Sequence, residues 1–385
     1  MKEMLGIFRI GVWGALAVLS AGAVGGWAEE PVEEPSERAM RVRVESAEDI
    51  GALTFAPLIH VRDGGVSGAW RGKSIWLFGD TVTTQPAASG LNWLSNTVAI
   101  TDVPEDPESL ESLCDCRFTE YSDRMVPPQE FVPWTQEESE YNSQHFTSQV
   151  DGAERRRFAI WPGAIVAAPD DRSAAIFFTK LTAGPGGAWD FQPVGRSVAF
   201  WRDIDQSPQR MEQTLFTQDD IQLGDAACRV GDWVYAYGFE QRDLSWPVRL
   251  GRVPFSQIAE RNAWRFWTAD GWSEHAQDAG TLFDGAPMMS VHYNEALGCF
   301  LCVYTVPLAN RLALRTSPSP EGPWSEPVAI CECLPTTFSV GCYAGVAHPE
   351  FTQDGGLTEY VTYYRETGVF QGEIRVVRVR LQRAP

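Results

Sequence analysis

The chain has 385 residues, with 31 Lys or Arg against 51 Asp or Glu, and a formal charge of −20 at pH 7. A hydrophobic fraction of 44% allows a sizeable core and excludes a wholly disordered chain. The acidic balance argues against nucleic acid and against an anionic membrane surface as partners, because both require a basic face on the protein.

The first segment predicts export. A short charged region precedes residues 10–24, which are almost continuously apolar or small, and Gly26-Trp27-Ala28 has the pattern of a cleavage site. A membrane anchor is the alternative, but this apolar run is shorter than the ~20 residues that a spanning helix needs. We therefore expect a signal peptide over residues 1–28, an acidic leader over 29–39, and a mature protein that is secreted or periplasmic.

A hairpin pattern recurs five times in the rest of the chain. Each copy has an extended segment, a turn rich in Gly, Asp or Asn, and a second, strongly apolar segment, as expected of paired β-strands. The first halves of the copies contain DGGVSGAW, WPGAIVAAP, GDAACRV, APMMSVHY and YAGVAHPEF. Repeats of roughly 50 residues fit the four-stranded blades of a propeller. We predict an all-β fold, a single-domain five-bladed β-propeller over residues 40–385, with a β-sandwich as the alternative.

Two segments fall outside the hairpins. Residues 40–46 alternate in the manner of a strand and could close the ring of blades. Residues 102–156 are acidic and irregular, and they predict one long loop insertion over a rim of the propeller.

The first hairpin carries the clearest chemical signal. If Arg71 and Gly72 form a two-residue turn, Asp63 falls directly opposite Asp80. Two carboxyl groups so close repel each other, so the pKa of one of them rises. One protonated and one ionised carboxyl is the arrangement that a glycoside hydrolase uses. We therefore predict Asp63 and Asp80 as catalytic residues; the alternative is that each caps a turn.

Polar and aromatic residues at a similar level of the other blades predict a ligand funnel. The same counting places Trp161 opposite Lys180, and it places Asp225 near Gly238. Hydrogen-bonding groups beside an aromatic face suit a polyhydroxylated ligand. The predicted substrate-binding residues are Arg62, Asn96, Trp161, Lys180, Asp225, His348 and Arg365. The alternative for His348 is a buried structural histidine.

Eight cysteines in an exported chain permit disulfides, and we predict at least one among Cys331, Cys333 and Cys342. The His and Cys spacings do not fit zinc. No cofactor is expected and no metal ligand is assigned, although a ring of carboxylates could hold a structural Ca²⁺ ion.

Four stretches resemble family 4185 of the domains of unknown function. In chain order they are RDGGVSGAWRGKSIWLFGDTV, WPGAIV, RTSPSPEGPWSEP and YAGVAHPEF. The resemblance implies a five-bladed propeller and, as in members grouped in glycoside hydrolase family 183, an endo-D-arabinanase activity. It also implies that the acidic pair of the family corresponds to Asp63 and Asp80. The insertion at residues 102–156 departs from the family pattern.

Together these features predict a secreted, monomeric glycoside hydrolase that cleaves a polysaccharide, for example a furanoside such as an arabinan. The alternative function is that of a propeller that binds carbohydrate or a surface without catalysis. A closely spaced carboxyl pair distinguishes the two, because a lectin does not need one.

Overall fold

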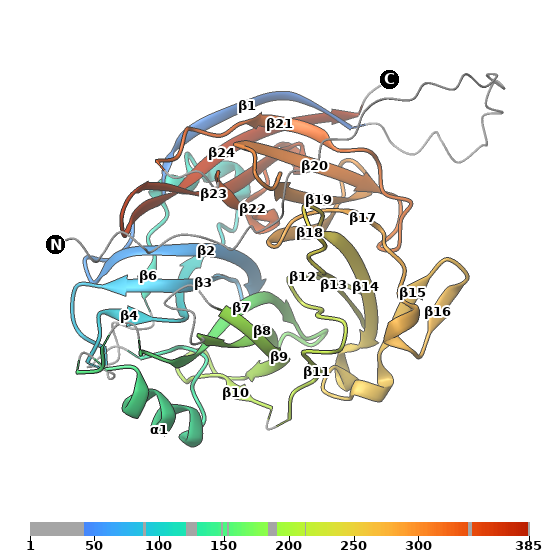
Figure 1. Ribbon diagram of the computed structural model, residues 1–385. Helices are drawn as coiled ribbons and strands as arrows, with labels where there is room; N and C mark the ends of the chain where they lie inside the picture. Colours follow the sequence, from blue (N-terminus) through green and yellow to red (C-terminus); the bar gives the residue numbers. More distant parts are fainter. Residues whose placement is uncertain are drawn as a thin grey trace, which may run out of the picture.

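The computed structural model describes residues 42–383, except residues 88–89, 121–128, 148, 152–153, 184–190, 212 and 338–340. The predicted signal peptide and acidic leader lie outside the described residues. Five antiparallel sheets stand around a central axis as the blades of a propeller (Figure 1). The predicted all-β, five-bladed fold is therefore confirmed. Within the described ranges, no helix is long and apolar enough to cross a membrane.

The blades are numbered along the chain, and their strands are given from the ring centre outward. Blade 1 contains β2 (Ile59–Trp70), β3 (Lys73–Thr83), β5 (Thr97–Asp102) and β6 (Thr119–Glu120), with β4 (Trp93–Leu94) beside β3. Blade 2 contains β7 (Arg157–Ala167), β8 (Ala174–Ala183), β9 (Phe191–Trp201) and β10 (Gln209–Arg210), with β11 (Phe216–Thr217) beside β9. Blade 3 contains β12 (Ala226–Val230), β13 (Trp233–Phe239), β14 (Pro247–Pro254), β15 (Arg265–Thr268) and β16 (Gly271–Ser273), with β17 (Phe283–Asp284) beside β14.

The last two blades have four strands each. Blade 4 contains β18 (Met289–Asn294), β19 (Cys299–Thr305), β20 (Arg311–Ser317) and β21 (Val328–Glu332). Blade 5 contains β22 (Tyr343–Ala347), β23 (Thr358–Gly368), β24 (Gln371–Arg383) and β1 (Val42–Ala52). The described helices are α1 (Gln136–His145) and the short 3₁₀ segments Pro107–Ser109, Leu113–Asp115, Phe255–Gln257, Arg261–Ala263, Ala276–Asp278, Pro349–Phe351 and Asp354–Gly356.

Strand β1 closes the ring. It pairs antiparallel with β24, so blade 5 is assembled from both ends of the described chain. This confirms that the alternating segment near residue 42 supplies the closing strand. The pairing also covers the edge of β24, which would otherwise present unpaired backbone groups to solvent.

The hydrophobic core is divided among the interfaces between neighbouring blades. Buried clusters fill the spaces between blades 1 and 2, 2 and 3, 3 and 4, 4 and 5, and 5 and 1. Side chains alternate along each strand, so both faces of a blade contribute. Cys299 therefore packs toward blade 5 whereas Cys302, three residues later on β19, packs toward blade 3.

The described part of the insertion at residues 102–156 contains more regular structure than expected. Its residues Thr119–Glu120 form β6, the outermost strand of blade 1, and its helix α1 lies beside β7. Thr135 caps the helix by accepting a hydrogen bond from the backbone of Glu138 at 3.2 Å. The insertion therefore completes one blade and joins it to the next.

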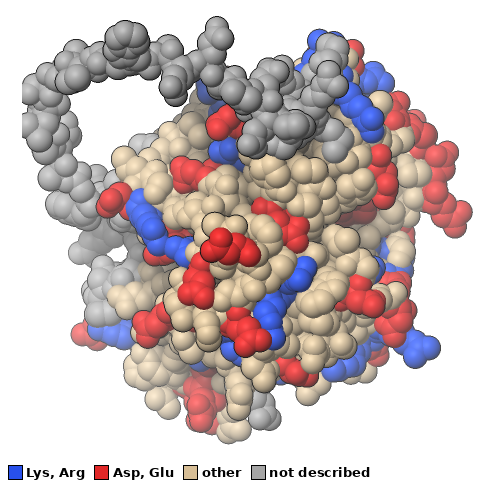
Figure 2. Space-filling view, turned by 90° about the vertical axis from the view of Figure 1, so that its right-hand side faces the viewer, with Lys and Arg blue, Asp and Glu red and all other residues tan. Residues whose placement is uncertain are grey.

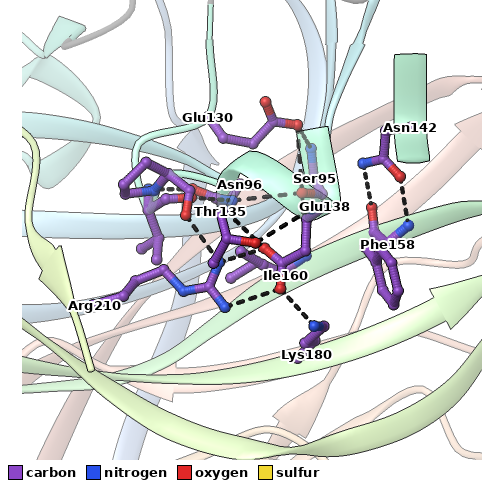
Figure 3. A network of polar contacts seen from close by, with 12 residues as sticks. Ser95, Asn96, Glu130, Thr135, Glu138, Asn142, Phe158, Ile160, Lys180 and Arg210 are labelled. Carbon is purple, nitrogen blue, oxygen red and sulfur yellow. Dashed lines mark hydrogen bonds and ion pairs between the residues drawn. The ribbon is translucent and has the colours of Figure 1, made fainter. Parts of the chain in front are cut away.

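Buried polar contacts fix helix α1 to blade 2 (Figure 3). The carboxylate of Glu138 pairs with Lys180 of β8 at 2.6 Å and with Arg210 of β10 at 2.5 Å. The side chain of Asn142 accepts a hydrogen bond from the backbone N–H of Phe158 at 2.7 Å and donates one to its carbonyl at 3.1 Å. These contacts satisfy polar groups that the insertion would otherwise bury unpaired.

The charged groups on the outside of the ring are mixed. Figure 2, which faces the side of the molecule on the right of Figure 1, shows acidic and basic side chains interspersed over that face. Several of them form exposed ion pairs, such as Arg265 with Glu274 at 2.7 Å.

Candidate active site

The strands at the ring centre bring distant residues together at one end of the ring. Near the beginnings of β2 and β22, the hydroxyl of Tyr343 donates a hydrogen bond to Asp63 Oδ2 at 2.9 Å. We call this end, marked by Asp63, Tyr343 and Trp161 of β7, the first rim. The polar side chains at the first rim come from blades that are far apart in sequence.

The pairing of β2 with β3 places Asp63 beside Asp80. Trp70 pairs with Lys73 across the turn, as the sequence predicts, and Arg71 and Gly72 have φ values of 53° and 69°. This is the backbone of a type I′ turn. Register shifts on either side of Gly64 cancel each other, so the pairing at Val61 and Arg62 returns to the register that simple counting gives.

Gly79 makes room for the carboxyl group of Asp63. A Cβ atom on Gly79 would lie 2.7 Å from Asp63 Oδ1, so the carboxyl group rests directly over the backbone of β3. The same Cβ position is 4.0 Å from Cδ1 of Trp161. The predicted residues Asp63, Asp80 and Trp161 are thus brought together.

The surroundings of Asp63 favour its protonated form. Burial, followed by the negative charge of Asp80, raises the pKa of Asp63 to about 7. The hydrogen bond from Tyr343 works in the opposite direction but is outweighed. At neutral pH this carboxyl group can therefore donate a proton.

Asp80 has a different environment from Asp63. Trp93 Nε1 donates a hydrogen bond to Asp80 Oδ1 at 2.9 Å, and Arg157 Nη2 lies 3.2 Å from the same oxygen in an ion pair. The Arg157 guanidinium also lies over the ring of Trp93, 4.7 Å from its centroid. The sequence analysis missed both residues, although Arg157 opens β7 and Trp93 follows Asp80 closely in the chain.

Glu366 is a third carboxyl group that the sequence analysis missed. Its side chain is 2% exposed, burial raises its pKa to about 7, and its negative charge contributes to the raised pKa of Asp63. The predicted neighbour Arg365 instead bonds to the Pro335 carbonyl at 2.6 Å and to Glu373 at 2.7 Å. Successive side chains on a strand point to opposite faces. Arg365 therefore faces away from Asp63, whereas its neighbour Glu366 is on the side of Asp63.

Aromatic rings surround the acidic pair. The pocket that contains Asp63 and Asp80 is also lined by Trp93, Tyr343, Tyr364 and Phe370. Carboxyl groups among aromatic side chains can bind a ligand that has both hydroxyl groups and apolar faces.

Arg62, Lys180 and Asn96 have partners of their own. The Arg62 guanidinium makes two hydrogen bonds to Glu120, at 2.8 and 2.7 Å, and lies against Phe55 and Phe78. Lys180 pairs with Glu138, as described above, because a bulge in β7 pairs Trp161 with Thr179 instead of Lys180. The fully buried Asn96 accepts a hydrogen bond from the backbone of Val132 at 2.7 Å and anchors the insertion (Figure 3).

His348 and Asp225 also have partners other than the acidic pair. His348 is fully buried after the end of β22, where it contacts Ser67 at 2.7 Å and Thr362 at 2.8 Å. Burial lowers its pKa to about 3, so the ring is neutral. Asp225 forms an ion pair with Arg196 of β9, and burial raises the pKa of Asp225.

Comparisons with known proteins agree with this architecture. A candidate hydrolase from Bacteroides ovatus superposes with a TM-score of 0.56 and 14% identity, covering 85% of this chain and 86% of its own. A β-xylosidase superposes with a TM-score of 0.50 and 12% identity, covering 84% of this chain and 96% of its own. A third structure, solved with xylotriose, is a family 43 β-xylosidase/α-arabinofuranosidase from a compost microbial metagenome. It superposes with a TM-score of 0.50 and 10% identity, covering 88% of this chain and 95% of its own.

The fold is therefore that of a propeller shared with glycoside hydrolases. The chain belongs to the family described as domain of unknown function DUF4185, whose model matches residues 59–372. This confirms the resemblance seen in the sequence. No curated protein matches the chain.

Proposed function

We propose that this protein is a glycoside hydrolase that cleaves a polysaccharide at the first rim, with Asp63 as the general acid. The observation that carries the proposal is the pKa of about 7 at Asp63, directly beside a second carboxyl group. A general acid works best when its pKa is near the working pH, because it is then protonated and still able to release the proton. Asp63 would donate that proton to the oxygen of the leaving sugar.

Asp80 is the partner in this proposal. Its carboxylate is oriented by Arg157 and Trp93, and it would act as the general base or the nucleophile. Glu366 supports the acid indirectly, because its negative charge favours the protonated form of Asp63. The two roles thus fall on two carboxyl groups with different neighbours.

For the substrate, we propose a polysaccharide made of furanoside units, such as an arabinan. The family resemblance suggests this sugar, and the aromatic lining of the pocket is compatible with a sugar ring. We further propose that the mature chain acts outside the cytoplasm, after removal of residues 1–28.

The test is a reducing-end assay of the purified mature chain on a polysaccharide panel that includes arabinans. We expect Asp63→Asn and Asp80→Asn each to lower the rate by about 10²–10⁴-fold, because an amide cannot transfer the proton or act as a nucleophile. Asp102→Asn, at a side chain that is 80% exposed, is the matched control and should keep the wild-type rate. Carbohydrate binding with no reducing ends released would instead identify a non-catalytic binding propeller.

A further inference from the structure

A second cavity, larger than the pocket at the acidic pair, lies between blades 2 and 3. Its volume is about 670 Å³, and its walls come from β8, β9, β13, β14 and the segment 218–222. That segment lies directly on β13, because a Cβ on Gly238 would be only 1.6 Å from the carbonyl oxygen of Gln222. The volume is within the range of roughly 300–1,000 Å³ that is usual for ligand pockets.

A row of side chains connects this cavity to the acidic pair. Trp161 pairs with Thr179, and Thr179 pairs with Arg196, so the three residues share the face of blade 2 that looks toward blade 3. Thr179 and Arg196 line the cavity, whereas Trp161 is adjacent to Gly79 and Asp63. Phe191, another lining residue, packs on Trp161 with ring centroids 4.9 Å apart. A chain-like ligand could therefore extend from the pair over Trp161 into the cavity.

Each arginine among the described lining residues of the cavity is paired with a carboxylate. Arg261 makes two hydrogen bonds to Asp220, at 2.7 and 2.9 Å. Arg249 pairs with Glu240 at 3.0 Å, and Arg196 pairs with Asp225. An anionic ligand would have to compete with these carboxylates and would also face Asp219.

Uncharged hydrogen-bonding and aromatic side chains also line the cavity. Four glutamines and two phenylalanines contribute to the walls, namely Gln218, Gln222, Gln241, Gln277, Phe191 and Phe239. Amides both donate and accept hydrogen bonds, and aromatic rings pack on apolar faces. This combination matches a neutral molecule with many hydroxyl groups.

We propose that the cavity between blades 2 and 3 binds uncharged sugar units of a polysaccharide, at a distance from the bond to be cleaved. The proposal rests on the proposed hydrolase function and adds to it the position and the charge class of an extended binding site. Arg249 and Arg261 shape the walls through their ion pairs, whereas the glutamines contact the sugar.

Binding can be measured without hydrolysis. The Asp63→Asn chain is titrated by calorimetry with a panel of neutral arabino-, xylo-, gluco-, galacto- and manno-oligosaccharides, and with oligogalacturonates of the same lengths. We expect a neutral oligosaccharide to bind more tightly than an oligogalacturonate of equal length. Adding Gln277→Trp, which fills the cavity, should weaken that binding by about tenfold or more. Gln257→Trp, at an exposed glutamine outside the cavity, is the matched control and should leave it unchanged.

The outcomes separate this proposal from the proposed function. Tighter binding of oligogalacturonates, no binding by any neutral member, or binding unaffected by Gln277→Trp would overturn the cavity proposal. If Gln277→Trp loses the binding of neutral oligosaccharides and the wild-type chain hydrolyses no substrate, the cavity proposal stands and the proposed hydrolase function is rejected. In an active enzyme, Gln277→Trp should raise KM for long substrates, whereas the control Gln257→Trp should not.

Discussion

The surroundings of Asp63 determine the pH at which it loses its proton. Burial and, to a smaller extent, the negative charges of Asp80 and Glu366 together raise the pKa of this residue to about 7. The activity of the proposed hydrolase should therefore fall as the pH rises through about 7 and Asp63 loses its proton.

Glu366→Gln tests this electrostatic contribution. The substitution removes a negative charge near Asp63, so the pKa of Asp63 should fall and the alkaline limb of the pH–rate profile should move to lower pH. The measurement is kcat/KM between pH 5 and 9 for the wild type and the variant. An alkaline limb at an unchanged pH would show that Glu366 does not act on the general acid.

The same raised pKa values have a cost in stability. Asp63 and Glu366 bind protons more tightly in the folded chain than in the unfolded chain, where their ordinary pKa values are 3.8 and 4.5. The free energy of unfolding should therefore decrease as the pH rises from about 4 to about 7, because the folded state holds more protons over that range. We expect Asp63→Asn and Glu366→Gln to melt above the wild type at pH 8, by a margin that shrinks toward pH 4. A margin independent of pH would contradict this account.

At the scale of elements, helix α1 depends on one carboxylate. Burial opposes the ionisation of Glu138, but the hydrogen bonds from Arg210 and Lys180 outweigh it and lower its pKa to about 2. The stabilisation is therefore present above pH 4.5 and is lost as the pH falls toward 2.

Glu138→Gln should leave Arg210 and Lys180 without a counter-charge. Removing one partner of a buried ion pair lowers the free energy of unfolding by about 3–5 kcal/mol. We therefore expect a lower melting temperature at pH 7 and faster proteolysis within residues 129–147. Glu140→Gln, at an exposed position of the same helix, is the control and should change neither. Equal behaviour of the two variants would show that the ion pair does not hold the helix.

The loop between blades 4 and 5 contains a candidate disulfide. All eight cysteines are free in this structure, but the thiols of Cys333 and Cys342 are hydrogen-bonded, which raises the pKa of Cys333 and lowers that of Cys342. Of the three cysteines in the predicted disulfide, we therefore propose Cys333 and Cys342 as the pair that forms it. Peptide mapping of the protein produced in an oxidising compartment, without reductant, should recover Cys333 linked to Cys342. Recovery of both as alkylated thiols would reject the disulfide.

The sequence predicts where strands and turns lie better than it predicts on which face of a strand each side chain lies. The Arg71-Gly72 turn has a strong local signature, and it located Asp63 and Asp80 because the register shifts near Gly64 cancel. In blade 2 the bulge after Pro162 is not compensated, so Lys180 turned out to lie on the face opposite Trp161. Local sequence does not reveal such bulges, and it does not show whether Arg365 or Glu366 faces Asp63.

On the scale of the whole molecule, the ring depends on the strand that closes it. Because β1 covers β24, deleting residues 42–52 should leave a long unpaired edge on blade 5. We expect a lower melting temperature and concentration-dependent aggregation, measured by calorimetry and light scattering. Deleting residues 29–39 instead should leave both unchanged, and similar losses in the two truncations would argue against a specific role for β1.

The same closure sets an order of events during synthesis. A ribosome makes β1 first among the described strands and its partner β24 last, so β1 must wait unpaired until nearly the whole chain has been made. Blades 1 to 4 can form their sheets from neighbouring segments as these emerge, whereas blade 5 can be completed only after the end of the chain arrives. For an exported protein, this order would keep the chain open during its passage through a membrane and delay closure until it reaches the far side.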